Sequence, residues 1–568
     1  MRFLGRAVVI CVLAGPAAAA GSVAAHAAAE TFAGAPTLGA VTSASIGSLL
    51  REPGIAAGLR DVRMLDDFYR TLGYRPAWQS AGGGWSDDAR RVLRRLQAAD
   101  DHGLDPADYA SPRLVGLIAD AGSGHASMRG DVALSVALLR FLDHASNGRI
   151  KPSRAGWDVW HHPRSAFAVE AATALSGGRI ADYVERAGPP GERYAALRSA
   201  RAHYVALAGE PYPRIGEGPT LRVGDRAPEV AVLRRQLRVL GDIEGTGDAV
   251  AGRSGDWRPP HFVLASAVAG ETQADLELYD SGLETAVQAF QRRHGLAVDG
   301  AVGPATRRAL DRTPRERLEQ IDLALERLRW MPVQRGERHV LVNVPGAELV
   351  AVNKGVERLR MRVVTGLPDW QTPIFSDEIV NLKFAPTWTI PVSIVRKDTL
   401  PRVRRDPGYL AANSIRVLRG GQEINPWSVD WHGTGPGEYV FRQDSGPASA
   451  LGGVRFSLTN NNGIFLHDTP SRRYFQRAER ALSHGCVRVA DPVALSAFLL
   501  EEQGGWDDGR IREAMGAARE RYQTLRAPVP VHIVYLTAWA EDGTVQFRDD
   551  VYGLDRKLAD LLAARPTG

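Results

Sequence analysis

The chain has 568 residues, of which 44% are hydrophobic, and this length allows several domains that each bury a core of their own. Its 70 lysine and arginine residues nearly balance its 65 aspartate and glutamate residues, so the formal net charge is only +5. Because the arginines are scattered along predicted helix faces and form no basic stripe, a nucleic-acid partner is not expected.

Residues 1–28 have the layout of a secretory signal peptide. Two arginines precede an apolar run at 7–15, and small residues suited to cleavage follow. We therefore expect export to the periplasm, with a membrane anchor only if the segment stays uncleaved. Cleavage would also remove Cys11, one of only two cysteines, and leave Cys486 as the single thiol of the exported chain.

The pattern over residues 45–212 predicts a helical domain. Ser86 is suited to be the N-cap of a helix over 86–104, which carries its apolar residues on one stripe and ends at Gly103. The segment 130–152 is apolar enough to be a buried helix. Periodicity alone assigns no function to this region.

Residues 217–312 contain a second set of predicted helices. The stretch 220–242 predicts a turn and then a helix ending in Leu-Gly, and 280–310 predicts two helices separated by a Val-Asp-Gly turn. With its run AVQAFQRRHGLAVDGAVGPAT, this region resembles a peptidoglycan-binding domain of the three-helix type. The resemblance implies contact with glycan or stem peptide. The stretch 242–278 is longer than such a module normally carries.

A joining helix and a strand-rich region follow. Residues 313–333 predict an amphipathic helix that acts as a rigid linker. From 338–540, alternating apolar patterns predict a mainly β domain, with 490–502 as one of its few helices. Within it, 394–437 is rich in Arg, Pro, Gly and Trp and has weak periodicity, which is typical of an irregular lid over a site. Residues 541–568 are expected to be a C-terminal extension.

The reactive side chains gather in the stretch LHDTPSRRYFQRAERALSHGCVRV. A lone exported cysteine suggests a reactive thiol, and a thiol nucleophile needs a neighbouring base. His467 suits that role because a strand end would hold its ring, whereas His484 is too close to Cys486 along the chain and would support the loop. Gly485 permits a tight turn whose N–H groups converge on an oxyanion. Arg488 adds positive charge that favours a thiolate or binds a carboxylate.

Two other interpretations of this cluster stay open at the level of sequence. The two histidines and the thiol are also a candidate zinc site with water as the fourth ligand. His-x-Cys is an awkward ligand spacing, however, and neither Cys-x-x-Cys nor His-Glu-x-x-His occurs. The cysteine is otherwise a small buried apolar residue without chemistry.

The pattern His…Ser-His-Gly-Cys-Val-Arg resembles the active-site signature of the L,D-transpeptidase catalytic domain, or YkuD fold. Stretches at 381–391, 442–456 and 535–553 resemble its YcbB-like branch, and HGLDPADY and NGRIKP match the N-terminal scaffold of that branch. Ser449 departs from the pattern, which has asparagine there. The resemblance implies a multidomain α+β fold: a helical scaffold, a three-helix peptidoglycan-binding domain and a mainly β catalytic domain of YkuD type.

The resemblance also implies a reaction. Cys486 would be the nucleophile and His467 the general base and acid, with His484, Gly485 and Arg488 supporting the oxyanion loop. The partners would be peptidoglycan stem peptides: a donor tetrapeptide, attacked at its third-position diaminopimelate with release of D-alanine, and an acceptor amine that resolves the thioester. Neither a metal nor an organic cofactor would be needed.

Three alternatives fit the same resemblance. In a hydrolase, water replaces the acceptor amine and the enzyme acts as a carboxypeptidase or endopeptidase. In protein attachment, the acceptor amine belongs to an outer-membrane protein. A non-catalytic wall-binding protein is disfavoured, because nucleophile, base and turn glycine are all present. The sequence does not separate the first two alternatives from transpeptidation.

Overall fold

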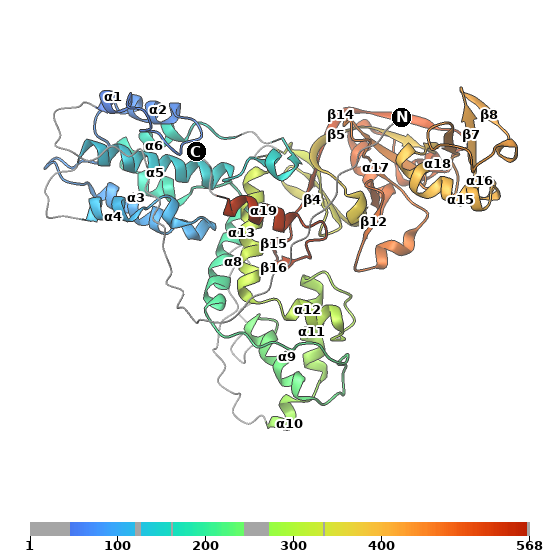
Figure 1. The fold of residues 1–568 in the computed structure, drawn as a ribbon, viewed down its shortest axis with the longest axis horizontal. Helices are drawn as coiled ribbons and strands as arrows, with labels where there is room; N and C mark the ends of the chain where they lie inside the picture. The colour runs from blue at the N-terminus through green and yellow to red at the C-terminus, as the bar shows by residue number, and fades with distance from the viewer. Residues whose placement is uncertain (1–45, 120–126, 161–162, 244–271, 333–334, 565–568) are drawn as a thin grey trace, which may run out of the picture.

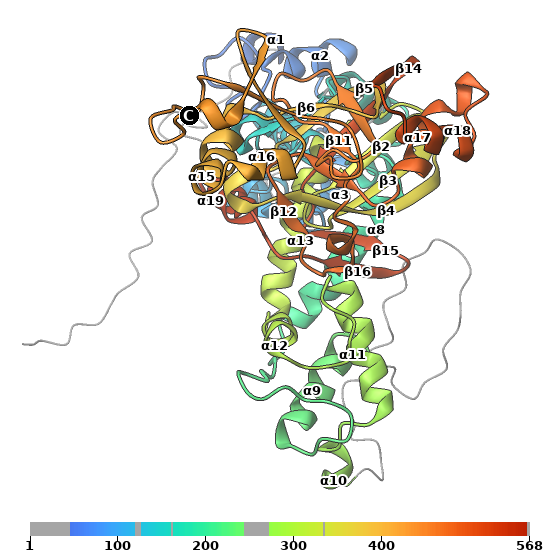
Figure 2. The same ribbon diagram turned by 90° about the vertical axis from the view of Figure 1, so that its right-hand side faces the viewer.

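The structure is a computed structural model that describes residues 46–119, 127–160, 163–243, 272–332 and 335–564. The expected signal peptide lies outside these ranges. Figure 1 shows a helical region on one side, a β-rich region on the other, and a small helical module below two long central helices. In the turned view the small module stands away from the rest (Figure 2). Within the described ranges, no helix combines the length and apolar character that a membrane span requires.

The helices of the N-terminal region up to residue 185 surround one core, whereas its last helix, residues 192–208, packs in the main core of the β-rich region. The predicted N-cap is confirmed, because the Ser86 hydroxyl accepts from the N–H of Ala89 at 3.1 Å. The helix that it caps is shorter than predicted, and a 3-10 turn separates its end from Gly103. The predicted buried helix is α5, ended by Gly148. The helices are α1 (Ile46–Leu49), α2 (Arg63–Thr71), α3 (Asp87–Gln97), α4 (Pro112–Ala119), α5 (Met128–Asn147), α6 (Phe167–Ser176), α7 (Ile180–Glu185) and α8 (Glu192–Ala208).

The small helical module buries a separate core. Gln291 ties its longest helix to the predicted Val-Asp-Gly turn, since its side chain accepts from the N–H of Gly300 and donates to the carbonyl of Ala301, both at 2.9 Å. Most of the long stretch 242–278 lies outside the described residues. The helices are α9 (Pro228–Val239), α10 (Gln273–Leu276), α11 (Ser281–Arg293) and α12 (Pro304–Leu310).

The helix at the predicted linker, α13 (Pro314–Trp330), packs into the main core. Arg327 is buried and pairs with Asp555 near the C-terminus. The ring of Trp330 meets that of Trp157, from the N-terminal region, edge-on at 5.1 Å. Helix α13 therefore contacts chain segments that lie far before and far after it.

The β-rich region is a ten-stranded sheet that closes on itself. Its strands are β1 (Trp157–Asp158), β2 (Arg338–Asn343), β3 (Glu348–Asn353), β4 (Val356–Gly366), β5 (Ile374–Phe384), β10 (Val454–Leu458), β11 (Leu466–His467), β12 (Ala481–Ser483), β13 (Val487–Val489) and β14 (Arg521–Val534). Neighbours follow the order β5-β10-β11-β13-β4-β3-β2-β14, and β14 pairs back with β5. Strand β1 comes from the N-terminal region and pairs parallel with β5.

Further elements flank this sheet. The predicted helix at 490–502 is present and has Asp491 as its N-cap, because the Asp491 carboxylate accepts from the N–H of Ala494 at 2.9 Å. Its helix packs on the sheet. The flanking elements are α17 (Pro492–Leu500), α18 (Asp508–Met515), the hairpin of β15 (Ala538–Glu541) and β16 (Thr544–Phe547), and α19 (Leu554–Ala563).

The expectation that residues 394–437, here called the lid segment, are irregular was wrong. The segment and its flanks form a four-stranded sheet of order β6-β9-β7-β8 and bury a core that includes Val403, Trp431 and Phe441. Each element is too short to produce a clear periodicity in the sequence. The elements are β6 (Trp388–Thr389), α14 (Val392–Ile394), a π-helical turn (Val395–Thr399), α15 (Leu400–Arg405), α16 (Gly408–Ala412), β7 (Ile415–Arg419), β8 (Gln422–Ile424) and β9 (Val440–Gln443).

Candidate active site

The candidate residues stand on three neighbouring strands. Strand β11 pairs antiparallel with β10, which sets Arg455 opposite His467, and parallel with β13, which sets His467 opposite Arg488. Paired residues lie on the same face of a sheet, and so do alternate residues of one strand. The face that carries His467 therefore also carries Phe465 and, two residues before Arg488, Cys486.

Cys486 lies diagonally across from His467 on this face. The N–H of Val487 donates to the carbonyl of Phe465 at 3.1 Å, so the pairing of the two strands extends to Cys486. Diagonal neighbours have Cα atoms roughly 7–8 Å apart, which an imidazole and a thiol can span. The thiol itself points to the carbonyl oxygen of Gly463, at 3.8 Å.

His467 is held as a neutral imidazole with a defined tautomer. Its side chain is buried, and Nδ1 lies 2.5 Å from the carbonyl oxygen of Asp468. A carbonyl can only accept, so Nδ1 carries the proton and Nε2 is left as the acceptor. Burial, helped by the positive charges of Arg488 and Arg455, lowers the pKa of His467 to about 3. At neutral pH the ring is therefore free to take up a proton.

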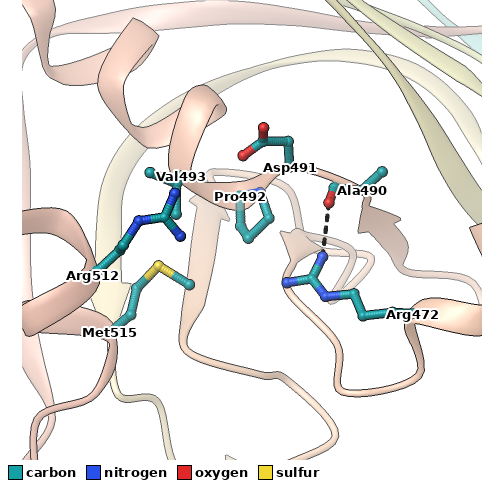
Figure 3. Close-up of a pocket in the computed structure, with 7 residues that line it drawn as sticks. All are labelled: Arg472, Ala490, Asp491, Pro492, Val493, Arg512 and Met515. Atoms are coloured by element: carbon teal, nitrogen blue, oxygen red, sulfur yellow. Dashed lines mark hydrogen bonds between the residues drawn. The ribbon is translucent and has the colours of Figure 1, made fainter. Parts of the chain in front are cut away.

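Asp468 fixes the backbone that follows the base. Its carboxylate accepts from the N–H groups of Gly453 and Thr469, at 2.8 and 2.6 Å, and pairs with Arg472 at 2.5 Å. Arg472 also donates to the carbonyl of Ala490 at 2.8 Å. Both residues line a cavity of about 310 Å³ between the start of α17 and the end of α18 (Figure 3). Asp468 was not predicted as a site residue, although its position directly after His467 is a signal for a supporting role.

Cys486 is half-buried and carries a neutral thiol at rest. Burial raises the pKa of the thiol to about 11, and this outweighs a hydrogen bond from the Phe465 backbone and the charges of Arg455 and Arg488, which lower it. The expected influence of Arg488 is thus present but smaller than that of burial. The resting pair is a thiol and a neutral imidazole, so an attack by the sulfur would require the proton to move at the same time.

The loop before the thiol is a tight turn. Gly485 has φ +109°, and a Cβ at this position would lie 3.3 Å from Ile464. Its N–H donates to Ser483 Oγ at 3.1 Å, so this group is used inside the loop. The N–H of Cys486 has no hydrogen-bond partner among the described residues. It is therefore a backbone donor available to a ligand oxygen, as is the N–H of His484, which also has no partner among the described residues.

Two residues that the sequence analysis did not single out hold the loop from behind. Thr372 Oγ1 donates to the carbonyl of Gly485 at 2.8 Å, across 113 positions of sequence. The N–H of Thr372 donates to the hydroxyl of Tyr552 at 3.2 Å, and that hydroxyl donates to the carbonyl of Gly366 at 2.6 Å. Tyr552 belongs to the expected extension 541–568. No local pattern marks Thr372, whereas Tyr552 lies in the stretch 535–553 that resembles the YcbB-like branch.

His484 faces the lid segment. Its ring meets the ring of Trp370 edge-on with 5.0 Å between centroids, and Lys397 Nζ lies 4.5 Å from the centroid of the same indole. Burial lowers the pKa of His484, and the charge of Asp398 opposes this. The lid segment thus reaches the nucleophile loop through Trp370.

The described residues offer no ligand set for the zinc interpretation. Within them, no group of three or more His, Cys, Asp or Glu side chains is arranged to hold a metal ion.

Comparison with protein-family models matches three parts of the chain. Residues 63–200 match a "Scaffold domain", residues 270–310 a "Putative peptidoglycan binding domain", and residues 337–531 an "L,D-transpeptidase catalytic domain". The matched ranges agree with the three-part fold class that the sequence predicted, and they confirm the family resemblance.

Two curated proteins share parts of the chain. A "Putative L,D-transpeptidase" of Haemophilus influenzae is 33% identical over 242 residues, or 42% of this chain and 49% of that protein. The "N-acetylmuramoyl-L-alanine amidase CwlM" of Mycobacterium tuberculosis is 39% identical over 101 residues, or 18% of this chain and 20% of that protein. The chain thus spans about half the length of the first relative and a fifth of the second.

Solved structures also align with the chain. An L,D-transpeptidase from Mycobacterium smegmatis aligns at 10% identity and a TM-score of 0.19, over 35% of this chain and 58% of that one. An L,D-transpeptidase from Stackebrandtia nassauensis aligns at 13% identity and a TM-score of 0.21, over 59% of this chain and all of that one.

Proposed function

Because residues 337–531 are an L,D-transpeptidase catalytic domain of the YkuD family, preceded by a scaffold domain and a peptidoglycan binding domain, we propose that this enzyme cross-links peptidoglycan stems between third-position diaminopimelate residues. The observation that supports the proposal most directly is one sheet face that carries both Cys486 and His467, with Nε2 of the imidazole left as an acceptor.

In the first half-reaction Cys486 attacks the carbonyl of diaminopimelate in a donor tetrapeptide. The thiol proton passes to Nε2 of His467 while the S–C bond forms, and the N–H of Cys486 stabilises the oxyanion. The bond to the terminal D-alanine then breaks, and His467 returns the proton to the departing amine. A thioester remains on Cys486.

In the second half-reaction the side-chain amine of an acceptor stem attacks the thioester. His467 takes a proton from the amine, the new amide forms, and the C–S bond breaks. The proton returns to the sulfur, which restores the resting thiol. Loop residues His484 and Gly485 shape the site in this scheme, and the lid segment helps to exclude the water that would hydrolyse the thioester.

The signal-peptide pattern and the small helical module are consistent with the proposed reaction. Peptidoglycan lies outside the cytoplasm, which agrees with the signal-peptide pattern of residues 1–28. The helical module of residues 217–312 would hold glycan or stem peptide close to the reaction.

The test supplies purified protein with disaccharide-tetrapeptide and identifies products by mass. We expect a cross-linked dimer that has lost one D-alanine, and no product from Cys486→Ala or His467→Ala. Melting temperatures of the variants control for folding.

Other product patterns decide between the alternatives. Tripeptide without dimer would assign a hydrolase in place of the transpeptidase. Transfer of the tripeptide stem onto an added protein amine, without formation of dimer, would assign protein attachment. Any product from Cys486→Ala would reject the thiol mechanism.

A further inference from the structure

Two arginines beside the proposed nucleophile lack acidic partners. Among the described residues, the guanidinium group of neither Arg455 nor Arg488 forms an ion pair or a hydrogen bond, and the Nε atom of each is buried without a partner. Each guanidinium instead lies against an aromatic ring, with Cζ of Arg455 4.2 Å from the centroid of Phe465 and Cζ of Arg488 5.9 Å from that of Tyr474.

Two other arginines of the same domain have carboxylate partners. Arg472 pairs with Asp468, and Arg360 pairs with Glu348 at 2.7 Å. Partly burying a cation without a counter-charge costs free energy, so such groups mark sites where a ligand brings the opposite charge. Two uncompensated guanidinium groups on one sheet face make that face attractive to a carboxylate.

The strand register places Arg455 and Arg488 on either side of His467. Arg455 lies opposite His467 on β10, and Arg488 follows two residues after Cys486 on β13. Both charges act on the thiol and on the imidazole, which agrees with this placement. An anion bound between them would therefore lie beside the attacked carbonyl.

We propose that Arg455 and Arg488 form a carboxylate-binding site for the C-terminal carboxylate of the donor stem, on the residue that acylation expels. This inference rests on the proposed function and deepens it. In the donor, that carboxylate carbon is separated from the attacked carbonyl carbon by one nitrogen and one α-carbon, a span of less than about 4 Å. The planar guanidinium fork matches a carboxylate in geometry and charge.

The site gives a physical reason for the length of the donor. A pentapeptide moves its terminal carboxylate roughly 3.5 Å further from the attacked carbonyl, and an amidated stem removes the charge. When the pentapeptide or the amidated stem binds, no carboxylate lies between Arg455 and Arg488, and both guanidinium groups stay unpaired. The two arginines therefore select a tetrapeptide with a free terminal acid.

The first experiment needs no turnover. Iodoacetate and iodoacetamide alkylate the same thiol but differ in one carboxylate, so the ratio of their rates on Cys486 reports a carboxylate site beside the sulfur. In the full-length wild-type chain we expect a ratio well above that of free cysteine. Arg455→Gln should lower it about 10-fold, and Arg455→Lys should restore part of it. An unchanged ratio in Arg455→Gln would overturn the site, whatever reaction the enzyme catalyses.

The second experiment compares a tetrapeptide donor with its C-terminal carboxamide and measures release of the terminal residue. The wild type should prefer the acid in kcat/KM by about 10- to 100-fold, mainly through KM, and Arg455→Gln should bring this preference close to one. Arg358→Gln is the matched control, since that guanidinium is half exposed and lies 3.9 Å from Glu501. Equal use of acid and amide by the wild type would overturn the carboxylate site alone. Product release from Cys486→Ala would instead refute the proposed function.

Discussion

His467 donates its Nδ1 proton to the carbonyl oxygen of Asp468, its own neighbour in sequence. Because donor and acceptor are adjacent, the tautomer of the base depends on the backbone conformation at Asp468. That conformation is held by the Asp468 carboxylate, which bonds to Gly453 on the neighbouring segment and to Arg472. We therefore propose that Asp468 and Arg472 position the proposed base, His467, which they do not touch through their side chains.

Arg472→Gln should lower kcat about 10-fold and leave KM for the donor nearly unchanged. The reason is that the variant loosens Asp468, a loss of about 1–2 kcal/mol for a charged hydrogen bond, without changing groups that meet the substrate. Steady-state kinetics with the tetrapeptide donor measures the split. Arg472→Lys should recover part of kcat, and a rise in KM at constant kcat would contradict a positioning role.

The pH profile should be flat through neutrality. His467 with a pKa of about 3 is already an available base at pH 5, and Cys486 with a pKa of about 11 is still a thiol at pH 9. Lowering the pH toward 3 protonates the base and abolishes activity, while no group of the pair titrates in between. Measurement of kcat/KM at intervals from pH 5 to pH 9, and then down toward pH 3, tests this profile. An inflection near pH 6.5 would mean that the imidazole is solvated or ion-paired with a thiolate.

Thr372→Val should reduce kcat about 10-fold and lower the melting temperature. The hydroxyl donates to the Gly485 carbonyl and accepts from the N–H of Gly366 at 2.9 Å, so its loss leaves two buried backbone groups unpaired, each at about 1–3 kcal/mol. Thr372→Ser keeps the hydroxyl and serves as the control. Full activity in the valine variant would show that the loop keeps its shape without this contact.

Lys397→Met should raise KM for the donor about two- to fivefold, since a cation over an indole contributes about 0.5–1 kcal/mol at an exposed site. The change weakens the contact between the lid segment and Trp370, while Cys486 and His467 stay in place. Arg396→Met, at an exposed position of the same π-helical turn, is the matched control. If both variants changed KM equally, the cause would be the loss of one positive charge from this surface, and the contact between Lys397 and the Trp370 ring would have no role in binding the donor.

Local features of this fold were predictable because their causes are local. Ser86 and Asp491 cap helices through hydrogen bonds to residues three positions on, and apolar alternation marks the hairpin of β2 and β3. The position of His467 at the end of a strand follows from the short apolar run before it.

Features that depend on distant segments were not predictable from such patterns. The return of β14 to β5 and the pairing of β1 join residues that no local period connects. Thr372 and Tyr552 meet behind the nucleophile loop only because the sheet closes. The lid segment was not predicted for a different reason: it and its flanks are built from elements of two to six residues.

Strand β1 has a practical consequence for dissecting this enzyme. A fragment cut at residues 337–531 would lose the two-residue strand that hydrogen-bonds to β5, together with Trp157 and Trp330, which pack against each other. It would also lose Tyr552, which braces the turn before the thiol. The isolated domain would expose apolar surface that is buried in the intact chain, and the loop that carries Cys486 would lack part of its support. Low solubility or weak turnover of the isolated domain would therefore say little about the intact enzyme.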